Sequence, residues 1–289
     1  MKSRSSWNEP GIVAVFSPEE SLRFNKRVVR FTVTQSTIGK LKNQIDLSYP
    51  DLAIIRIQSN NVHLVNELYS SFPEVFFVDC LVQYRIDLEK IALKKDHFPV
   101  DLDILIAEKS HFGELDHLVS ESFSGYENHY GRNPALSEFD LVSIYQEWVR
   151  SSIMSQDKTC LLFFSNEVPC GFFTAETSGR TFRGLLSGVD PRYRGSGFFR
   201  QIIRSVKSIF RGSGATEIVT NVILENRPVH KVLQDEGFSI SNSFFTVHLN
   251  LRTAHTLPPS RRWARKIKSL TTVPIQRRSR FTEITESSY

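Results

Sequence analysis

The chain has 289 residues, of which 40% are hydrophobic and 23% charged, as in an ordinary soluble protein with one large or two modest domains. No stretch approaches the roughly 18 uninterrupted apolar residues of a membrane-spanning helix, and the first twenty residues lack the apolar segment of a signal peptide. Cys80, Cys160 and Cys170 are too few and too scattered for a disulfide framework or a zinc site. We therefore expect a cytoplasmic protein with reduced thiols and no metal.

The net charge of +5 comes from the C-terminal end of the chain. After residue 255 there are eight lysines and arginines and two glutamates, so this segment carries +6 and the rest about −1. Residues 252–289 are expected to form a basic flexible tail, either solvated or in peripheral contact with an anionic membrane or a protein. Nucleic acid is not an expected partner, because a basic tail without a structured patch is weak evidence for it.

The first third of the chain is predicted to contain a small α/β domain over 23–97. Residues 1–22 show no periodicity and are expected to be an irregular lead-in. The elements after it are predicted as strands at 27–33, 52–57 and 76–88, with helices starting near 37 and at 62. Because this domain has no glycine loop and no acid–base cluster, its predicted role is that of a scaffold.

A linker at 94–99 leads to a second domain over 101–251. Its elements are predicted in the order β, α, α, β, β, β, α, β, α, β. They are strand 102–107, helices 110–123 and 139–154, strands 159–164, 169–176 and 181–189, helix 196–210, strand 215–224, helix 228–236 and strand 244–251. The predicted fold class is α/β (α+β) with a mixed central sheet.

The most informative stretch follows the strand at 181–189. It reads Val189-Asp190-Pro191-Arg192-Tyr193-Arg194-Gly195-Ser196-Gly197-Phe198-Phe199, a strand end, a glycine-bearing loop and a helix start. Glycines let a ligand approach the backbone closely, and the start of a helix offers unpaired N–H groups and the positive end of its dipole. This combination is typical of a pyrophosphate-binding loop. The alternative is an ordinary turn between a strand and a helix.

This Arg-Gly-x-Gly run after Val-x-Pro resembles the acyl-CoA-binding loop of the GCN5-related N-acetyltransferase (GNAT) superfamily. The resemblance implies the GNAT fold, with splayed fourth and fifth strands, and acetyl-CoA as acyl donor. The CoA-binding residues that it implies are Leu186, Ser187, Gly188, Val189, Arg194, Gly195, Ser196, Gly197, Phe198, Phe199, Asn221 and Asn226. Asn226 precedes Pro228 and is equally expected as a plain helix N-cap.

The resemblance also implies a chemistry, in which an amine attacks the acetyl thioester while an acid protonates the leaving thiolate. The sequence departs from the family at two positions. Phe199 stands where the family usually has Gly or Ala, and Leu233 stands where it commonly has the tyrosine acid. His230, one helical turn earlier, is a candidate for the missing acid, and Tyr130 and His129 are others. A poor acid would slow the reaction without preventing it, because a CoA thiolate is already a good leaving group.

The acceptor is expected to meet the loop at 123–134 and the helix after it. Tyr126, Asn128, His129, Tyr130 and Trp148 suit a sugar ring or nucleobase better than a peptide, and core packing is the alternative.

Together with the N-terminal domain, the pattern resembles the dTDP-fucosamine acetyltransferase group over residues 25–251. That resemblance implies a nucleotide-linked amino sugar as acceptor, in cell-surface polysaccharide biosynthesis. The alternatives are another small amine or a peptide N-terminus, and a degenerate domain that binds without turnover. A homodimer is a further expectation.

Overall fold

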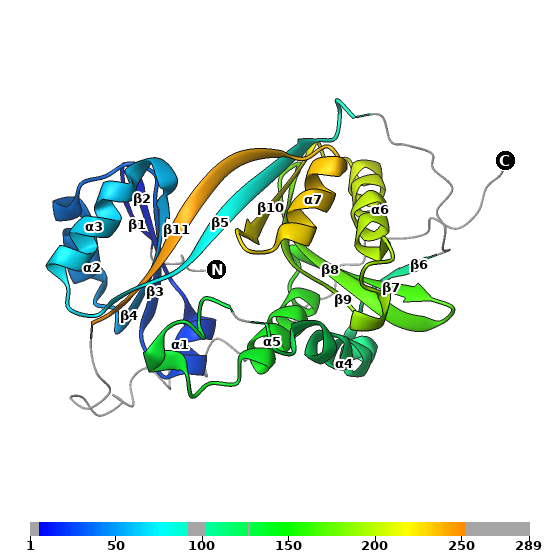
Figure 1. Cartoon of the computed structure of the whole chain (residues 1–289), viewed down its shortest axis with the longest axis horizontal. Helices are drawn as coiled ribbons and strands as arrows, with labels where there is room; N and C mark the ends of the chain where they lie inside the picture. The colour runs from blue at the N-terminus through cyan, green and yellow to red at the C-terminus, as the bar shows by residue number, and fades with distance from the viewer. Residues whose placement is uncertain (1–5, 92–101, 127, 252–289) are drawn as a thin grey trace. The chain divides into compact units, whose positions relative to one another are not determined.

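The computed structural model describes residues 6–91, 102–126 and 128–251, which belong to one compact unit. The predicted linker at 94–99 and the basic tail at 252–289 lie outside these ranges. Within the described residues the strands are β1 (Ser6–Glu9), β2 (Ile12–Phe16), β3 (Val28–Val33), β4 (Leu52–Gln58), β5 (Val75–Asp87), β6 (Asp103–Ile106), β7 (Lys158–Ser165), β8 (Val168–Ser178), β9 (Thr181–Val189), β10 (Glu217–Ile223) and β11 (Ser239–Asn250). The α-helices are α1 (Pro18–Phe24), α2 (Ile38–Ser48), α3 (Val62–Ser71), α4 (Phe112–Phe123), α5 (Leu141–Met154), α6 (Phe198–Gly212) and α7 (Arg227–Asp235) (Figure 1).

The eleven strands of the described ranges form one mixed sheet in the order β1-β2-β3-β4-β11-β5-β10-β9-β8-β7-β6. The pairs β3/β4 and β9/β10 are parallel, and the other neighbours are antiparallel. The last strand of the sequence, β11, lies between β4 and β5, and β5 in turn pairs with β10 (Figure 1). The sheet is therefore continuous from the predicted N-terminal domain into the second one.

Every helix and strand predicted between residues 23 and 251 is present, with ends that differ by a few residues. The predicted hairpin around Asn166 and Glu167 is a two-residue turn in which both residues have positive φ, 50° and 63°. That conformation matches the right-handed twist of the flanking strands β7 and β8.

The N-terminal segment differs from the prediction. Residues 6–22, expected to be irregular, form β1, β2 and most of α1. Strand β2 is ordered by its antiparallel pairing with β3, which lies further along the chain, and local periodicity does not reveal such pairing. Pro18 then begins α1 at a position where the missing backbone N–H is not needed.

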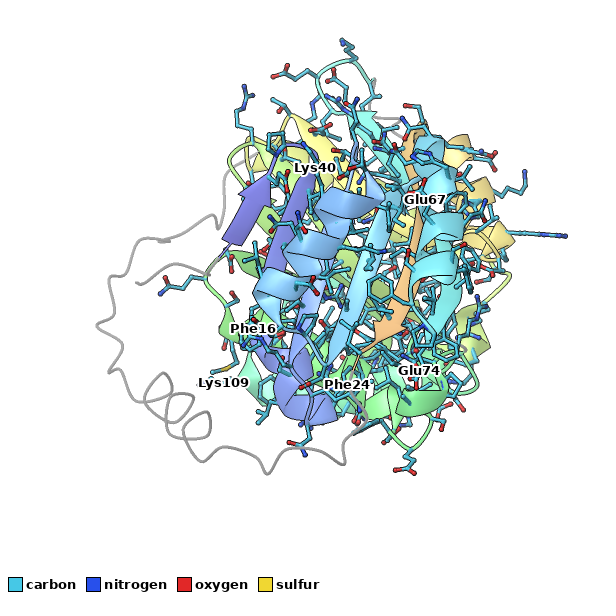
Figure 2. The ribbon with its side chains drawn as sticks, turned by 90° about the vertical axis from the view of Figure 1, so that its left-hand side faces the viewer. Phe16, Phe24, Lys40, Glu67, Glu74 and Lys109 are labelled. Atoms are coloured by element: carbon cyan, nitrogen blue, oxygen red, sulfur yellow. The ribbon has the colours of Figure 1, made fainter. Side chains whose placement is uncertain are left out.

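Helices cover both faces of the sheet. In β7, Leu161 and Phe163 pack in the cluster that contains α6 and α7, whereas Cys160 and Leu162 pack against α4 and α5. Because successive side chains of a strand point to opposite faces, α6 and α7 lie on one face and α4 and α5 on the other. Helices α2 and α3 pack on β2–β4 and lie in front of these strands in Figure 2. Within the described ranges, none of the helices has the length and apolar character needed to cross a membrane.

Candidate functional site

Strands β9 and β10 run parallel at first and then separate. Their pairing extends from Thr181 opposite Glu217 to Gly184 opposite Thr220. Beyond that point β9 stays paired with β8 and β10 stays paired with β5, so the two strands diverge. The splay between the fourth and fifth strands of the second half is therefore present.

The backbone of β9 leaves hydrogen-bonding groups directed into this gap. The N–H of Leu186 donates to Thr174 Oγ1, and the N–H of Asp190 donates to the carbonyl of Cys170, both on β8. Since the direction of these groups alternates along a strand, those of Ser187 point toward β10. An extended ligand with amide groups could pair there.

The loop after β9 has an open backbone. Gly195 and Gly197 have φ of 77° and 86°, in the left-handed region that favours glycine. A Cβ added to either would meet nothing within 4 Å, so the space beside the loop is free. Gly197 is the N-cap of α6 without a side-chain cap, and the Ser196 hydroxyl donates back to the carbonyl of Tyr193 at 2.7 Å. The first N–H groups of α6 are therefore available to an anion.

Side chains around the loop fasten it in place. The Arg194 guanidinium donates to the carbonyls of Ser122 at 2.8 Å and Val189 at 3.3 Å, which ties the loop to α4 and β9. Phe198 is buried, and Phe199 packs at the edge of the same core cluster. The Phe at position 199, where the family usually has Gly or Ala, is thus accommodated by packing.

Three of the predicted CoA residues have structural partners. A Cβ on Gly188 would lie 2.8 Å from Ser122 Oγ and 2.6 Å from the Phe172 ring, so α4 approaches β9 because this residue has no side chain. Asn221 Oδ1 accepts a hydrogen bond from Gln83 Nε2 at 3.3 Å. Asn226 caps α7 by accepting from the N–H of Val229 at 3.4 Å, as the N-cap interpretation predicts.

His230 is held on both ring nitrogens. Its Nε2 donates to the carbonyl of Ile223 at 3.0 Å, and its Nδ1 lies 2.9 Å from the hydroxyl of Tyr84. Because a carbonyl can only accept, the neutral ring carries its proton on Nε2 and Nδ1 accepts from Tyr84. Leu233, in the place of the family's tyrosine, is buried in the core with α6. Tyr84, on β5, was not predicted as a site residue.

Tyr130 and His129 lie in a buried polar network between the loop and the sheet. The Tyr130 hydroxyl donates to Glu20, and Arg30 donates to both groups. Burial raises the pKa of Tyr130 above its usual value. Burial would also raise the pKa of Glu20, but the Arg30 charge and the hydrogen bonds outweigh it and lower that pKa to about 2. The hydroxyl of Tyr130 is therefore committed to this network.

The histidine pair has a defined direction of hydrogen bonding. Asn133 Nδ2 donates to His248 Nδ1 at 3.1 Å, so His248 carries its proton on Nε2 and donates to His129 Nδ1 at 2.9 Å. Both rings are thus neutral. Burial lowers the pKa of His248 to about 3, and burial together with His248 lowers that of His129 well below its ordinary value. These hydrogen bonds hold the loop that carries His129 and Asn133 against His248 of β11.

The other predicted acceptor residues are Asn128 and Tyr126 in the loop and Trp148 on α5. Asn128 is buried and its Oδ1 accepts from the N–H groups of Tyr130 and Gly131, which shapes the loop. Tyr126 and Trp148 are half-buried and pack edge-to-face on Tyr145 of α5. Core packing and ligand contact are both compatible with their partial exposure.

Three polar side chains near this loop were missed by the sequence analysis: Arg56 on β4, Asp79 on β5 and Thr246 on β11. Asp79 had a usable signal, because it is a single acid inside the apolar run Val75–Val82. Arg56 and Thr246 had none, since their proximity depends on how β4, β11 and β5 pair.

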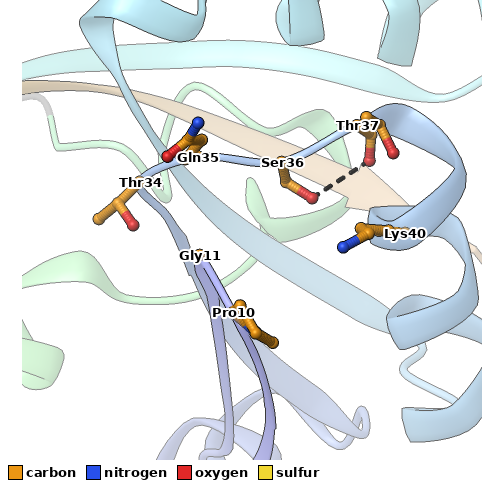
Figure 3. A pocket seen from close by; sticks show the side chains of 7 residues that line it. All are labelled: Pro10, Gly11, Thr34, Gln35, Ser36, Thr37 and Lys40. Carbon is orange, nitrogen blue, oxygen red and sulfur yellow. Dashed lines mark hydrogen bonds between the residues drawn. The ribbon is translucent and has the colours of Figure 1, made fainter.

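A surface pocket of about 460 Å³ lies elsewhere, at the β1–β2 turn and the connection from β3 to α2 (Figure 3). Its lining residues are Pro10, Gly11, Thr34, Gln35, Ser36, Thr37 and Lys40. Lys40 forms an ion pair with Glu9 at 3.3 Å. None of the predicted site residues contributes to this pocket, so we do not assign the function to it.

Comparison with protein-family models gave no match, and comparison with curated protein sequences gave none either. Solved structures do match. A conserved protein of unknown function from Staphylococcus epidermidis has a TM-score of 0.61 at 12% identity, over 86% of this chain and 95% of that one. A GCN5-related N-acetyltransferase from Sphaerobacter thermophilus has a TM-score of 0.61 at 11% identity, over 86% of this chain and 79% of that one.

A third structure, a GCN5-related N-acetyltransferase from Kribbella flavida, has a TM-score of 0.57 at 9% identity, over 89% of this chain and 93% of that one. These identities are low, so the likeness is one of fold. The expected fold class is confirmed: the chain has a GNAT fold with a mixed sheet. The three solved structures each match 86–89% of this chain, a share too large to lie within either predicted domain alone.

Proposed function

We propose that the protein is an acetyl-CoA-dependent N-acyltransferase that acetylates the amine of a nucleotide-linked amino sugar. The observation that carries this proposal is the divergence of β9 from β10 beside an uncapped glycine loop at the start of α6. Such a site offers backbone groups to an amide-bearing chain and N–H groups to a pyrophosphate. The three free cysteines fit the cytoplasm as the proposed setting.

The proposal gives each part of the site a task. The N–H groups around Gly195, Gly197 and Phe198 would hold the pyrophosphate, with Arg194 keeping the loop in position. The gap-side groups of Ser187 would pair with the pantetheine amides. Bound acetyl-CoA would supply an activated acetyl thioester. The chain then needs to align the acceptor amine, remove one proton from it, and provide one proton to the departing sulfur.

The acceptor class is supported by the character of the side chains near the loop at 124–134. Aromatic rings and amide groups together suit a ring with hydroxyl and amino substituents. A peptide N-terminus or another small amine would satisfy the same chemistry at the sulfur and would differ only at this side of the site.

The first test is thermal unfolding with and without acetyl-CoA. At a hundredfold excess over Kd the ligand should stabilise the fold by about 2.7 kcal/mol, which corresponds to roughly 5–10 °C in Tm for a protein of this size. A dTDP-linked amino sugar should add a further shift. If acetyl-CoA produced no shift, the glycine loop would be an ordinary turn and the enzyme proposal would be withdrawn.

The second test addresses the proton at the sulfur. His230 can protonate the sulfur only if its Nε2–H leaves the carbonyl of Ile223 when the substrates bind. On that condition we expect His230→Ala to lower kcat about tenfold, at the low end of general acid catalysis because the thiolate leaves readily, with the Kd for CoA unchanged. Tyr84 would act through His230 as a positioning residue, so Tyr84→Phe should lower kcat less, and the double variant should be no slower than His230→Ala alone.

The matched control is His63→Ala, the same substitution at an exposed position of α3. It should leave kcat unchanged. An unaltered kcat in His230→Ala would remove His230 as the acid, and additive effects of the two variants would remove the positioning role of Tyr84.

A further inference from the structure

Three polar side chains form a row across the sheet next to the predicted acceptor loop. Thr246 on β11 lies opposite Arg56 on β4 and opposite Asp79 on β5. Residues that pair directly across neighbouring strands present their side chains on the same face. The three side chains therefore stand side by side, and we call them the Arg56–Thr246–Asp79 row.

The polar atoms of this row are buried and incompletely hydrogen-bonded among the described residues. Asp79 is 3% exposed and Thr246 is 1% exposed. Asp79 Oδ1, Thr246 Oγ1, Arg56 Nε and Nδ2 of the buried Asn128 make no hydrogen bond of good geometry. Thr246 still lies near enough to Asp79, and Asn128 near enough to Tyr145, to lower the pKa of those groups. Buried polar atoms are nearly always hydrogen-bonded, because leaving one unpaired costs its full desolvation. A group that supplies both donors and acceptors is therefore expected to meet this row.

In the part of the chain that the structure describes, the nearby arginines leave Asp79 without an ion-pair partner of its own. Arg30 is engaged by Glu20, and Arg132 by Glu225 at 3.1 Å. Burial raises the pKa of Asp79, while Thr246, Arg56 and Arg132 act in the opposite direction.

The loop residue Tyr126 is electrostatically coupled to Asp79. Burial and then the charges of Asp79 and Glu225 raise the pKa of the Tyr126 hydroxyl to about 12. A predicted acceptor residue and the row thus share one environment.

The row shares a face of the sheet with Gln83 and Asn221, and Asn221 borders the gap between β9 and β10. Asp79, Leu81 and Gln83 alternate along β5 and share a face, and Gln83 lies opposite Asn221 of β10. Asn221 is the first residue of β10 beyond the pairing with β9. The row can therefore contact the part of an acceptor that extends from this gap.

We propose that the Arg56–Thr246–Asp79 row, with Asn128, binds the polar ring of the acceptor, namely the sugar of a nucleotide-linked amino sugar. This inference rests on the proposed function. Asp79 Oδ1 accepts a hydrogen bond from a hydroxyl or amino group of the ring, and Arg56 Nε donates one to a ring oxygen substituent. Thr246 Oγ1 can donate a hydrogen bond to the ring or accept one from it. The nucleotide lies outside the row.

The experiment measures the binding of two probes by calorimetry, in the absence of acetyl-CoA. The probes are dTDP-4-amino-4,6-dideoxygalactose and dTDP, which differ by the sugar. Asp79→Asn and Thr246→Val should each weaken binding of the nucleotide sugar at least tenfold and change binding of dTDP less than twofold. Asp46→Asn, the same change of charge at an exposed position of α2, should alter neither.

Each other outcome overturns the inference. Equal weakening for both probes would assign the row to the nucleotide, and unchanged affinity for both would mean that the row holds internal water only. Failure of the wild-type chain to bind the sugar probe would reject this acceptor class at the row. None of these results depends on acetyl-CoA, whose binding is tested separately by the shift in Tm. The assignment of the row and the proposed use of acetyl-CoA can therefore fail independently. Since Asp79→Asn removes a buried charge that has no ion-pair partner within the described ranges, its Tm should be no lower than that of the wild type. Measuring this Tm separates a loss of binding from misfolding.

Discussion

Gly197→Glu is expected to abolish acetyl-CoA binding. Gly197 is the N-cap of α6, with φ of 86° and free space beside it. A glutamate there would place a negative charge at the N–H groups proposed to hold the pyrophosphate, and it would cover the open loop. Loss of two or three charge-assisted hydrogen bonds, each worth about 1.5–3 kcal/mol, lowers the affinity by a factor of a hundred or more.

A second glycine provides a matched control for backbone strain. Gly214, after α6, has φ of 87°, is exposed, and has free space beside it as Gly197 does. Placing a side chain in the left-handed region costs about 1–2 kcal/mol at either position. Gly214→Glu should therefore lower Tm as much as Gly197→Glu while leaving the Kd for acetyl-CoA within twofold of the wild type. Equal Kd values in the two variants would show that the loop does not bind CoA.

The fold was predictable because most of its elements carry their own periodicity. The alternating strand at 181–189, the turn chemistry of Asn166-Glu167 and the glycines after Val189 are all local signals. The glycine loop and the order of elements together led to the GNAT fold. The same reasoning missed β1 and β2, which are short and owe their order to pairing with β3.

The candidate site was predictable only where backbone conformation defines it. The residue type alone makes a positive φ expected at Gly195 and Gly197. The partners of a side chain, in contrast, are set by packing between segments that are distant in the sequence. Tyr84 reaches His230 because β5 pairs with β10, and Asp79 reaches Thr246 because β11 lies beside β5. No spacing rule connects residues that are more than a hundred positions apart.

The free energy of unfolding is expected to fall steeply as the pH drops below about 6.5. His248 is fully buried and neutral, and its pKa in the folded chain is lowered to about 3. In the unfolded chain a histidine titrates near its ordinary pKa of about 6.5. Between these values the unfolded state binds a proton that the folded state does not, so protons favour unfolding. At pH 5 the loss from His248 alone is roughly 2 kcal/mol, and His129, whose pKa is lowered as well, acts in the same direction.

Glu20 extends this acid sensitivity to lower pH. Its carboxylate is stabilised in the folded chain, with a pKa of about 2, by Arg30 and Tyr130. That stabilisation is complete above the unfolded pKa of about 4.5 and is lost as the pH falls from there toward 2. The histidines and Glu20 therefore act in two overlapping pH windows, the first between about pH 6.5 and 3 and the second between about 4.5 and 2. A variant without His248 should alter the first window alone.

Denaturant unfolding at pH 5, 6, 7 and 8 separates these contributions. His248→Gln keeps an amide that can accept from Asn133 but cannot titrate, so its slope between pH 6 and 5 should be smaller by about 1.4 kcal/mol per pH unit. His63→Gln, at an exposed position of α3, should keep the wild-type slope. The slope is independent of any stability lost through repacking, because a packing defect lowers the free energy equally at every pH. Parallel curves for His248→Gln and the wild type would mean that His248 is protonated in the folded chain, and the direction of hydrogen bonding from Asn133 through His248 to His129 would have to be reversed.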